Sequence, residues 1–211
     1  EPVVKQTVRL FGKPVAAMRD MSKPCAASVT SLREQGVKDF ICHYHFIADI
    51  GSDLLERDHR RLKNSLKAAK VTATLRQLLS SLGGPAAITS GAKTAKLAAI
   101  VYWTLNGNGR TPRFPFGLAH LDYAKRVLSA PQQAADIISG LRSKKLRQAV
   151  DKLKHTARSL LDHDAHHIMS RLEHSRLLFE RLRSILRMED RSAAHEQPLL
   201  PEAEVFQRAI I

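Results

Sequence analysis

Asp20 is the first residue of this sequence whose type and position could do chemistry. It follows a short apolar run at residues 15–18 and precedes a helical pattern. A carboxylate at the carboxyl end of a strand is the kind of oxygen ligand that Mg²⁺ takes, and such acids hold the ions in two-metal phosphoryl transfer. The alternative interpretation is an aspartate that caps the following helix.

The run Cys42-His43-Tyr44-His45 is the second group. If these residues continue a strand, Cys42 and Tyr44 lie on one side of it, and His43 and His45 lie on the other. Cys-x-x-His has the ligand types of half a zinc site, but a structural zinc site needs four ligands and the sequence has only one other cysteine, Cys25. The alternative is a buried cysteine that packs with partnered histidines at the strand end.

The third group is Asp162, His163, Asp164, His166 and His167. His163 and His167 are four residues apart and would share one face of a helix, which suggests a small metal-dependent hydrolase. The group also lies where one predicted helix ends and the next begins. In that case Asp162 or Asp164 would serve as a helix N-cap.

The elements that must position these residues change character near residue 47. A helix over residues 3–11 ends at Gly12, a strand covers 15–19, a helix with Ser22 as its N-cap ends before Gly36, and a second strand covers 37–42. Helical periodicity then predicts helices at 46–67, 71–82, 93–105, 120–129, 131–141, 143–161 and 164–188.

We therefore expect a mostly α fold with a small α/β part. Residues 1–47 would form a strand-helix-strand domain, residues 48–191 an all-helical domain, and residues 192–211 an exposed connection.

Charge is the strongest compositional signal. Lys and Arg number 34 against 20 Asp and Glu, a formal net charge of +14, which indicates an acidic partner such as nucleic acid. An anionic membrane surface or a need for solubility is the alternative. The candidate contacts to a DNA backbone lie on two basic helices: Arg60, Arg61, Lys63, Lys144, Lys145 and Arg147.

Several classes are excluded by sequence pattern. No apolar run approaches the roughly 18 residues that span a bilayer, and two cysteines make no disulfide framework, so we expect a reducing cytoplasm and no membrane partner. The sequence has no Walker loop, no dinucleotide-binding fingerprint and no Gly-x-Ser-x-Gly nucleophile motif.

Taken together, these segments resemble the central part of bacterial insertion-sequence transposases of the DDE type. The resemblance rests on Phe11-Gly12-Lys13-Pro14, the strand that ends at Asp20, and the run ICHYHFIADIGSDLL at residues 41–55. It covers residues 9–62. A looser likeness reaches about residue 127, through Phe114-Pro115-Phe116 and Leu121-Asp122-Tyr123, which resemble a segment of the family's helical insertion.

The resemblance implies a partial RNase H-like core followed by a helical insertion. In that family two aspartates and a glutamate hold Mg²⁺ or Mn²⁺ for DNA strand cleavage and transfer at the element's ends. Asp20 matches the second aspartate, with Cys42 and His45 as candidates for ordering the site. The first acid would lie before Glu1 and the third beyond Ile211, with Glu173 or Glu180 as a fallback.

We therefore expect a transposase fragment that is inactive as an isolated chain. The complete protein would be a homo-oligomer that binds DNA at the bacterial nucleoid. The alternative function is a non-catalytic, basic helical protein that binds DNA or acts as a scaffold, in which Asp20 is only a cap.

Overall fold

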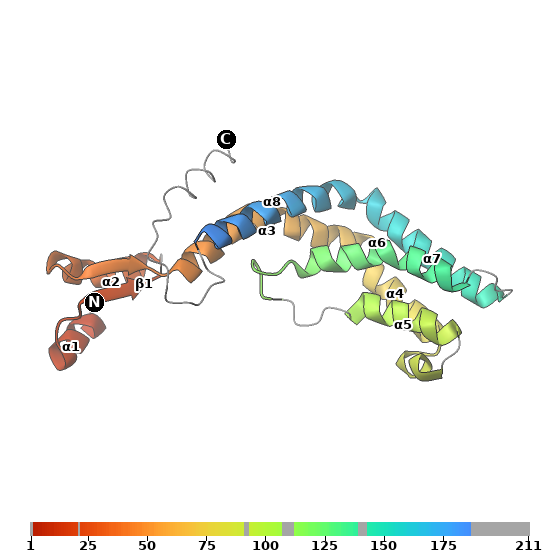
Figure 1. Cartoon of the computed structure of the whole chain (residues 1–211), viewed down its shortest axis with the longest axis horizontal. Helices are drawn as coiled ribbons and strands as arrows, with labels where there is room; N and C mark the ends of the chain where they lie inside the picture. The colour runs from red at the N-terminus through yellow and green to blue at the C-terminus, as the bar shows by residue number, and fades with distance from the viewer. Residues whose placement is uncertain (1, 21, 91–92, 107–111, 139–142, 187–211) are drawn as a thin grey trace. The chain divides into compact units, whose positions relative to one another are not determined.

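The computed structural model describes residues 2–20, 22–90, 93–106, 112–138 and 143–186 (Figure 1). These residues are mostly helical, with one two-stranded parallel sheet, so the predicted mostly α fold with a small α/β part is confirmed. The elements are α1 Pro2–Phe11, β1 Ala16–Arg19, α2 Lys23–Glu34, β2 Lys38–Ile41, α3 His43–Ala68, α4 Val71–Ser81, the 3₁₀ helix η1 Pro85–Ser90, α5 Lys93–Asn106, α6 Ala119–Ile138, α7 Lys144–Asp162 and α8 Ala165–Ile185.

The chain divides into two compact units. One contains Glu1–Leu54 together with Leu177–Ile211, and the other contains Leu55–Arg176. The first boundary therefore falls inside α3 rather than near residue 47, and the second falls inside α8. The predicted connection at 192–211 lies outside the described residues.

In the first unit, β1, α2 and β2 form the strand-helix-strand predicted from the sequence. The strands are parallel, with Ala17 opposite Asp39 and Arg19 opposite Ile41. Ser22 caps α2, because its side chain accepts a hydrogen bond from the Cys25 N–H at 3.4 Å. Gly36 follows the helix with a φ of +80°, a conformation that costs glycine little.

One face of this small sheet is packed and the other is open. Val29 and Leu32 of α2 and Val37 beside β2 form the buried core, against which Val4, Val8 and Ala17 pack. Met18 and Phe40, which pair across the strands, keep 73% and 50% of their surface exposed. Apolar side chains of α1 are largely exposed too, at Val3, Leu10 and Phe11.

The second unit is built from helices around a core rich in leucine. In this unit α5 packs against α4, α6 and η1, and α7 packs against α4 and α6. Its fully or almost fully buried side chains include Leu55, Leu62, Leu75, Leu97, Leu121, Leu153, Leu160 and Leu172. Within the described part of the chain, no helix is both long enough and apolar enough to cross a membrane.

Helix α6 corrects one prediction, because it runs unbroken through Pro131 where the sequence indicated two helices. Proline lacks the N–H that would bond to the carbonyl four residues earlier and is costly inside a helix. Ala130 and Ala134 are fully buried and Val127 is 3% exposed. Burial of this face between α5 and α7 offsets the local cost of the proline.

Candidate functional site

Asp20 lies directly after β1, at the carboxyl end of the parallel sheet, where side chains of α/β units converge on ligands. One carboxylate oxygen, Oδ1, accepts hydrogen bonds from the Ser22 backbone N–H at 2.9 Å and from the Ser22 hydroxyl at 2.6 Å. Asp20 therefore shapes the turn into α2, while Ser22 is the residue that caps the helix. The prediction of Ser22 as the N-cap is therefore confirmed, and the alternative in which Asp20 itself is the cap is wrong.

These hydrogen bonds keep Asp20 ionised. The Ser22 hydroxyl, the Cys25 side chain and the Ser22 N–H lower the pKa of Asp20 to about 2, and the charge of His45 adds a smaller effect. At neutral pH the residue is a carboxylate with one oxygen, Oδ2, that Ser22 does not engage. By its chemistry, Asp20 fits as a single oxygen ligand for a divalent cation.

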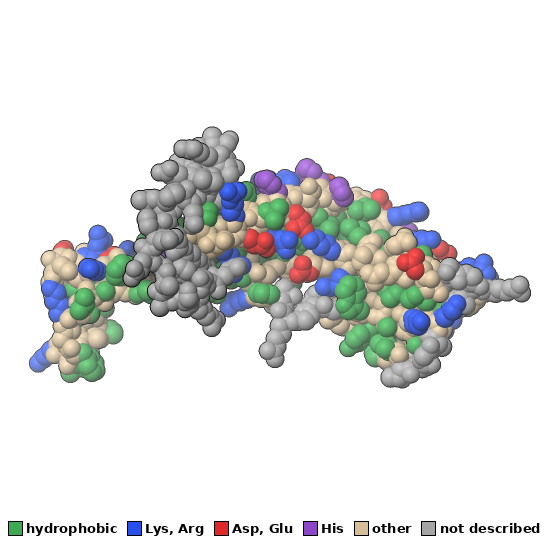
Figure 2. Space-filling view, viewed as in Figure 1, with side chains coloured by type: hydrophobic (Ala, Val, Ile, Leu, Met, Phe, Trp, Pro, Cys, Tyr) green, Lys and Arg blue, Asp and Glu red, His purple; other side chains and the backbone are tan. Residues whose placement is uncertain are grey.

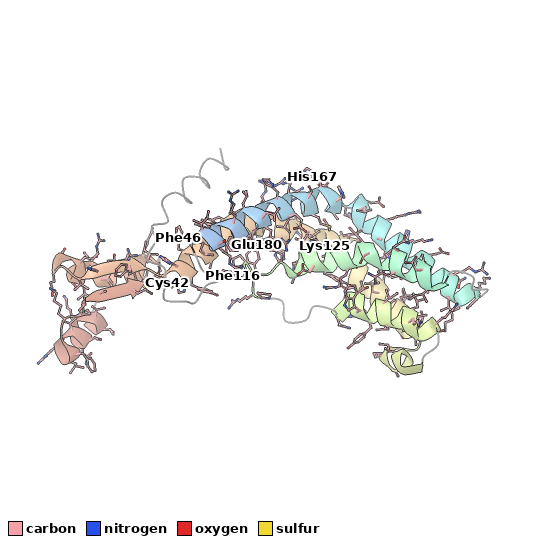
Figure 3. All side chains as sticks on the ribbon, viewed as in Figure 1. Cys42, Phe46, Phe116, Lys125, His167 and Glu180 are labelled. Carbon is pink, nitrogen blue, oxygen red and sulfur yellow. The ribbon has the colours of Figure 1, made fainter. Side chains whose placement is uncertain are left out.

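Cys42 begins a helix, so the predicted strand alternation over residues 42–45 is wrong. Its N–H donates to the Arg19 carbonyl at 2.7 Å, which extends the ladder, and its carbonyl accepts from the Phe46 N–H at 3.1 Å, which opens α3. Figure 3 shows Cys42 and Phe46 at this start of α3. The hydrogen bond to Arg19 is the last one of the sheet, which therefore ends at Cys42. The Cys42 carbonyl then accepts the first hydrogen bond of the helix.

The helical start brings Cys42 and His45 together. The pKa of the Cys42 thiol is lowered, first by a hydrogen bond from the His45 backbone N–H and next by one from the His45 side chain. His45 also acts on the Asp20 carboxylate. The two residues proposed to order the site therefore lie beside each other, and His45 lies within electrostatic reach of Asp20.

Asp39 is a second acid of the sheet that the sequence analysis missed. Arg19 donates to it through Nε at 3.0 Å and Nη2 at 3.1 Å, and Arg33 lies 3.7 Å away. The Asp39 side chain is only 13% exposed. This carboxylate is therefore neutralised by arginine. The signal in the sequence was an aspartate inside a short strand, a place where aspartate is depleted.

No group of three or more His, Cys, Asp or Glu side chains that could hold a metal ion occurs within the described ranges. The cluster at residues 162–167 is therefore not assembled as predicted. His163 is the C-cap of α7 and Asp164 lies in the turn with a φ of +60°, so His163 and His167 do not share a helical face. The Asp164 carbonyl accepts from the Ile168 N–H at 3.1 Å, as an N-cap residue does, and His167 projects from α8 (Figure 3).

The structure shows ion pairs for two of the predicted DNA contacts, Arg60 and Arg61. Arg60 pairs with Glu56 one turn away, and Arg61 lies 3.6 Å from Asp58 and 3.5 Å from Asp164. The other candidates are exposed, at Lys63 on α3 and at Lys144, Lys145 and Arg147 on α7. On the face in Figure 2, acidic and basic side chains are intermixed over α6 and α8.

Asp58 is the buried acid beside which Arg61 lies. Its side chain is 9% exposed, and Arg171 of α8 lies 2.8 Å from its Oδ2. Ser65 adds a hydrogen bond to the His163 carbonyl at 3.0 Å. These contacts tie α3 to the start of α8. They were not visible in the sequence, since Asp58 and Arg171 are far apart along the chain.

Glu173, one of the fallback acids, takes part in salt bridges. It pairs with Lys125 of α6 and with Arg176, whose Nε lies 3.1 Å from it. Glu180 is exposed on α8.

Comparison with known proteins adds no relative to this description. No family model, no curated protein and no solved structure matches the chain.

Proposed function

We propose that this chain is part of a DDE-type DNA transposase and that Asp20 is one of its catalytic carboxylates. The observation that carries the proposal is an ionised aspartate directly after β1, at the carboxyl end of a parallel strand-helix-strand unit. The likeness of residues 9–62 to insertion-sequence transposases supplies the family. In this proposal β1, α2 and β2 are part of an RNase H-like core, and the second unit is its helical insertion.

The open face of the sheet supports this assignment. Parallel sheets are usually covered on both faces, yet Met18 and Phe40 remain largely exposed beside Ile41 and Tyr44. Such a surface is suited to further elements of a larger core.

Each residue has a limited role in the proposal. A divalent cation, when bound, would activate the attacking oxygen and stabilise the leaving oxygen of a phosphodiester. Asp20 would offer the oxygen that Ser22 leaves unengaged, and Cys42 with His45 would order the strand end. Asp39 is committed to Arg19, and the described residues contain no group of three or more side chains that could hold a metal ion. We therefore expect the chain alone to cut no DNA.

Paramagnetic NMR tests the role of Asp20 directly. Mn²⁺ added to the purified chain should broaden the amide signals of residues 20–22, and the change Asp20→Asn should abolish this broadening. Asp53→Asn is the matched control, because it removes an exposed carboxylate from α3 and should leave the broadening intact. Broadening that persists unchanged in Asp20→Asn would overturn the metal-ligand role.

The family assignment has a separate test. Sequencing the DNA on both sides of the coding segment should reveal an upstream strand that ends in Asp and a downstream helix that bears Glu. Their absence would refute the transposase assignment. Metal-dependent DNA cleavage by the purified chain would contradict the expectation that two acids lie elsewhere.

A non-catalytic DNA-binding or scaffolding protein is the second candidate. It is favoured by the exposed basic side chains of α7 and by the role of Asp20 in the turn before α2. DNA binding by the wild type together with no Mn²⁺ broadening at residues 20–22 would select it.

A further inference from the structure

The second unit contains a basic groove between α3, α4 and α6 that plays no part in the site around Asp20. It has a volume of about 520 Å³, and four cations line it: Lys63, Lys67, Lys70 and Arg76. A neighbouring hollow of about 320 Å³ reaches α5 and shares Arg76, Thr72, His120 and Tyr123 with it. The two hollows form one surface, here called the α3–α4–α6 groove.

The positive charge of the groove is uncompensated. No carboxylate lines either hollow. In the described part of the chain none of the four cations pairs with an acid, although Arg60 and Arg61 on the same helix α3 do. All four are exposed. A surface that gathers cations without acids attracts an anion by charge complementarity.

The spacing of Lys63, Lys67 and Lys70 along the chain brings their positive charges close together. Lys63 and Lys67 are one helical turn apart on α3, an arrangement in which like charges repel. Lys70 continues the same side at the turn into α4, where it adopts a left-handed φ of 50°. A series of cations along one groove wall matches a ligand that carries several negative charges in a row.

Aromatic and polar groups also line the groove. The Tyr123 hydroxyl lies 3.1 Å from the Thr72 hydroxyl, and the Arg126 guanidinium lies 5.8 Å from the Tyr123 ring centroid. His120 stacks on His59 with ring centroids 4.6 Å apart. Burial first, and then Lys63, lower the pKa of His120, so its neutral ring adds no repulsion and can take part in hydrogen bonds.

We propose that the α3–α4–α6 groove binds the phosphodiester backbone of a DNA strand. The row of unpaired cations would neutralise successive phosphates, and Tyr102, Tyr123 and His120 offer rings near the bases, a combination typical of sequence-independent strand binding. This inference rests on the DNA partner of the proposed function. It adds to that function a binding surface on the helical unit.

Fluorescence anisotropy with a labelled oligonucleotide tests the groove. The variant Lys63→Gln/Lys67→Gln/Arg76→Gln removes three exposed charges and should bind about tenfold more weakly or worse at low salt. Its plot of log affinity against log salt concentration should be shallower by about one for each lost phosphate contact. The matched control is Lys152→Gln/Lys154→Gln/Arg158→Gln, which removes the same number of exposed positive charges from α7 and should lose less affinity.

The possible results distinguish a failure of the groove proposal from a failure of the proposed function. Unchanged binding by the groove variant, with or without a loss in the α7 variant, would overturn the groove while the DNA partner stands. Equal losses in both variants would also overturn it, since they would show a response to net charge alone. No binding by the wild type would overturn the DNA partner itself, and the groove with it.

A second measurement guards against misfolding of the groove variant. DNA added to the wild-type chain should shift the imidazole NMR signals of His120 and leave those of His155, an exposed residue of α7, in place. Shifts at His155 without shifts at His120 would place the DNA elsewhere and refute the groove.

Discussion

The Asp20 carboxylate gains its low pKa from the same bonds that shape its turn. Donors from Ser22 favour the charged form, so protonation weakens the turn. The folded-state pKa of about 2 lies below the ordinary value of 3.8. The stability that Asp20 contributes is therefore present above pH 3.8 and is lost as the pH falls through 2. A structural turn and an ionised ligand are compatible roles for this residue.

His59 gives a pH prediction in a different window. Burial, His120 and Lys63 lower its pKa from 6.5 to about 4. The unfolded chain then binds more protons than the folded chain, so the protein should lose stability as the pH falls from 6.5 to 4. Urea denaturation at several pH values should show this slope, and His59→Gln should flatten it.

The control for this prediction is His155→Gln, which removes an exposed imidazole on α7 and should keep the wild-type slope. His59→Gln also loses the stacking of His59 on Phe114, at 5.0 Å between ring centroids. That loss should lower stability at every pH. An unchanged slope in His59→Gln would refute the assigned pKa.

Asp58 and Arg171 provide a prediction about a buried charge. Arg171→Met leaves the buried Asp58 carboxylate with only the more distant Arg61, and should destabilise the protein by about 1–3 kcal/mol in urea unfolding. Arg158→Met, an exposed arginine on α7, should change stability by less than about 0.5 kcal/mol. Similar losses in the two variants would mean that the Asp58–Arg171 pair does not stabilise the fold.

At the scale of elements, α6 shows how packing overrides local preference. Pro131 costs the helix a hydrogen bond, yet α6 continues because its small buried residues pack between α5 and α7. Pro131→Ala should therefore stabilise the protein by about 1–3 kcal/mol, measured by urea unfolding. Gln132→Ala, on the exposed side, should stay within about 0.5 kcal/mol. A destabilised Pro131→Ala variant would show that the packing requires the proline geometry.

Helix α3 contributes residues to both units, because the boundary between Leu54 and Leu55 falls inside it. Its first turn holds Cys42 and His45 beside the sheet, and its last turns supply Lys63 and Lys67 to the groove. Between them, Asp58 and Arg61 face α8. One amphipathic helix thus carries three separate surfaces.

At the scale of the whole molecule, the two units differ in their cores. Among its described residues, the strand-helix-strand segment buries Val29, Leu32 and Val37, whereas the helical unit buries many leucines. Local stability follows the apolar surface that opening exposes. Hydrogen exchange should therefore be faster at the amides of β1, α2 and β2 than at those of α5, α6 and α7. Equal protection in the two units would show that the small core is reinforced by contacts other than these.

Local signals in the sequence were sufficient for β1, α2 and β2 and for most helices of the second unit. Ser22, Gly36 and the short apolar runs predicted β1, α2 and β2, because caps, turns and strand patterns involve residues close together in the chain. The position of Asp20 at the strand end followed from the same signals. The net charge of +14 likewise indicated an anionic partner without any structure.

Tertiary structure decided which of the candidate side chains meet. It continued α6 through Pro131, ended the sheet at Cys42 through the bond to the Arg19 carbonyl, and paired Asp58 with Arg171. It also gathered cations from α3 and α4 into one groove beside Tyr123. These features depend on contacts between residues distant in the chain, whose energies outweigh local propensity and leave no pattern in a single sequence.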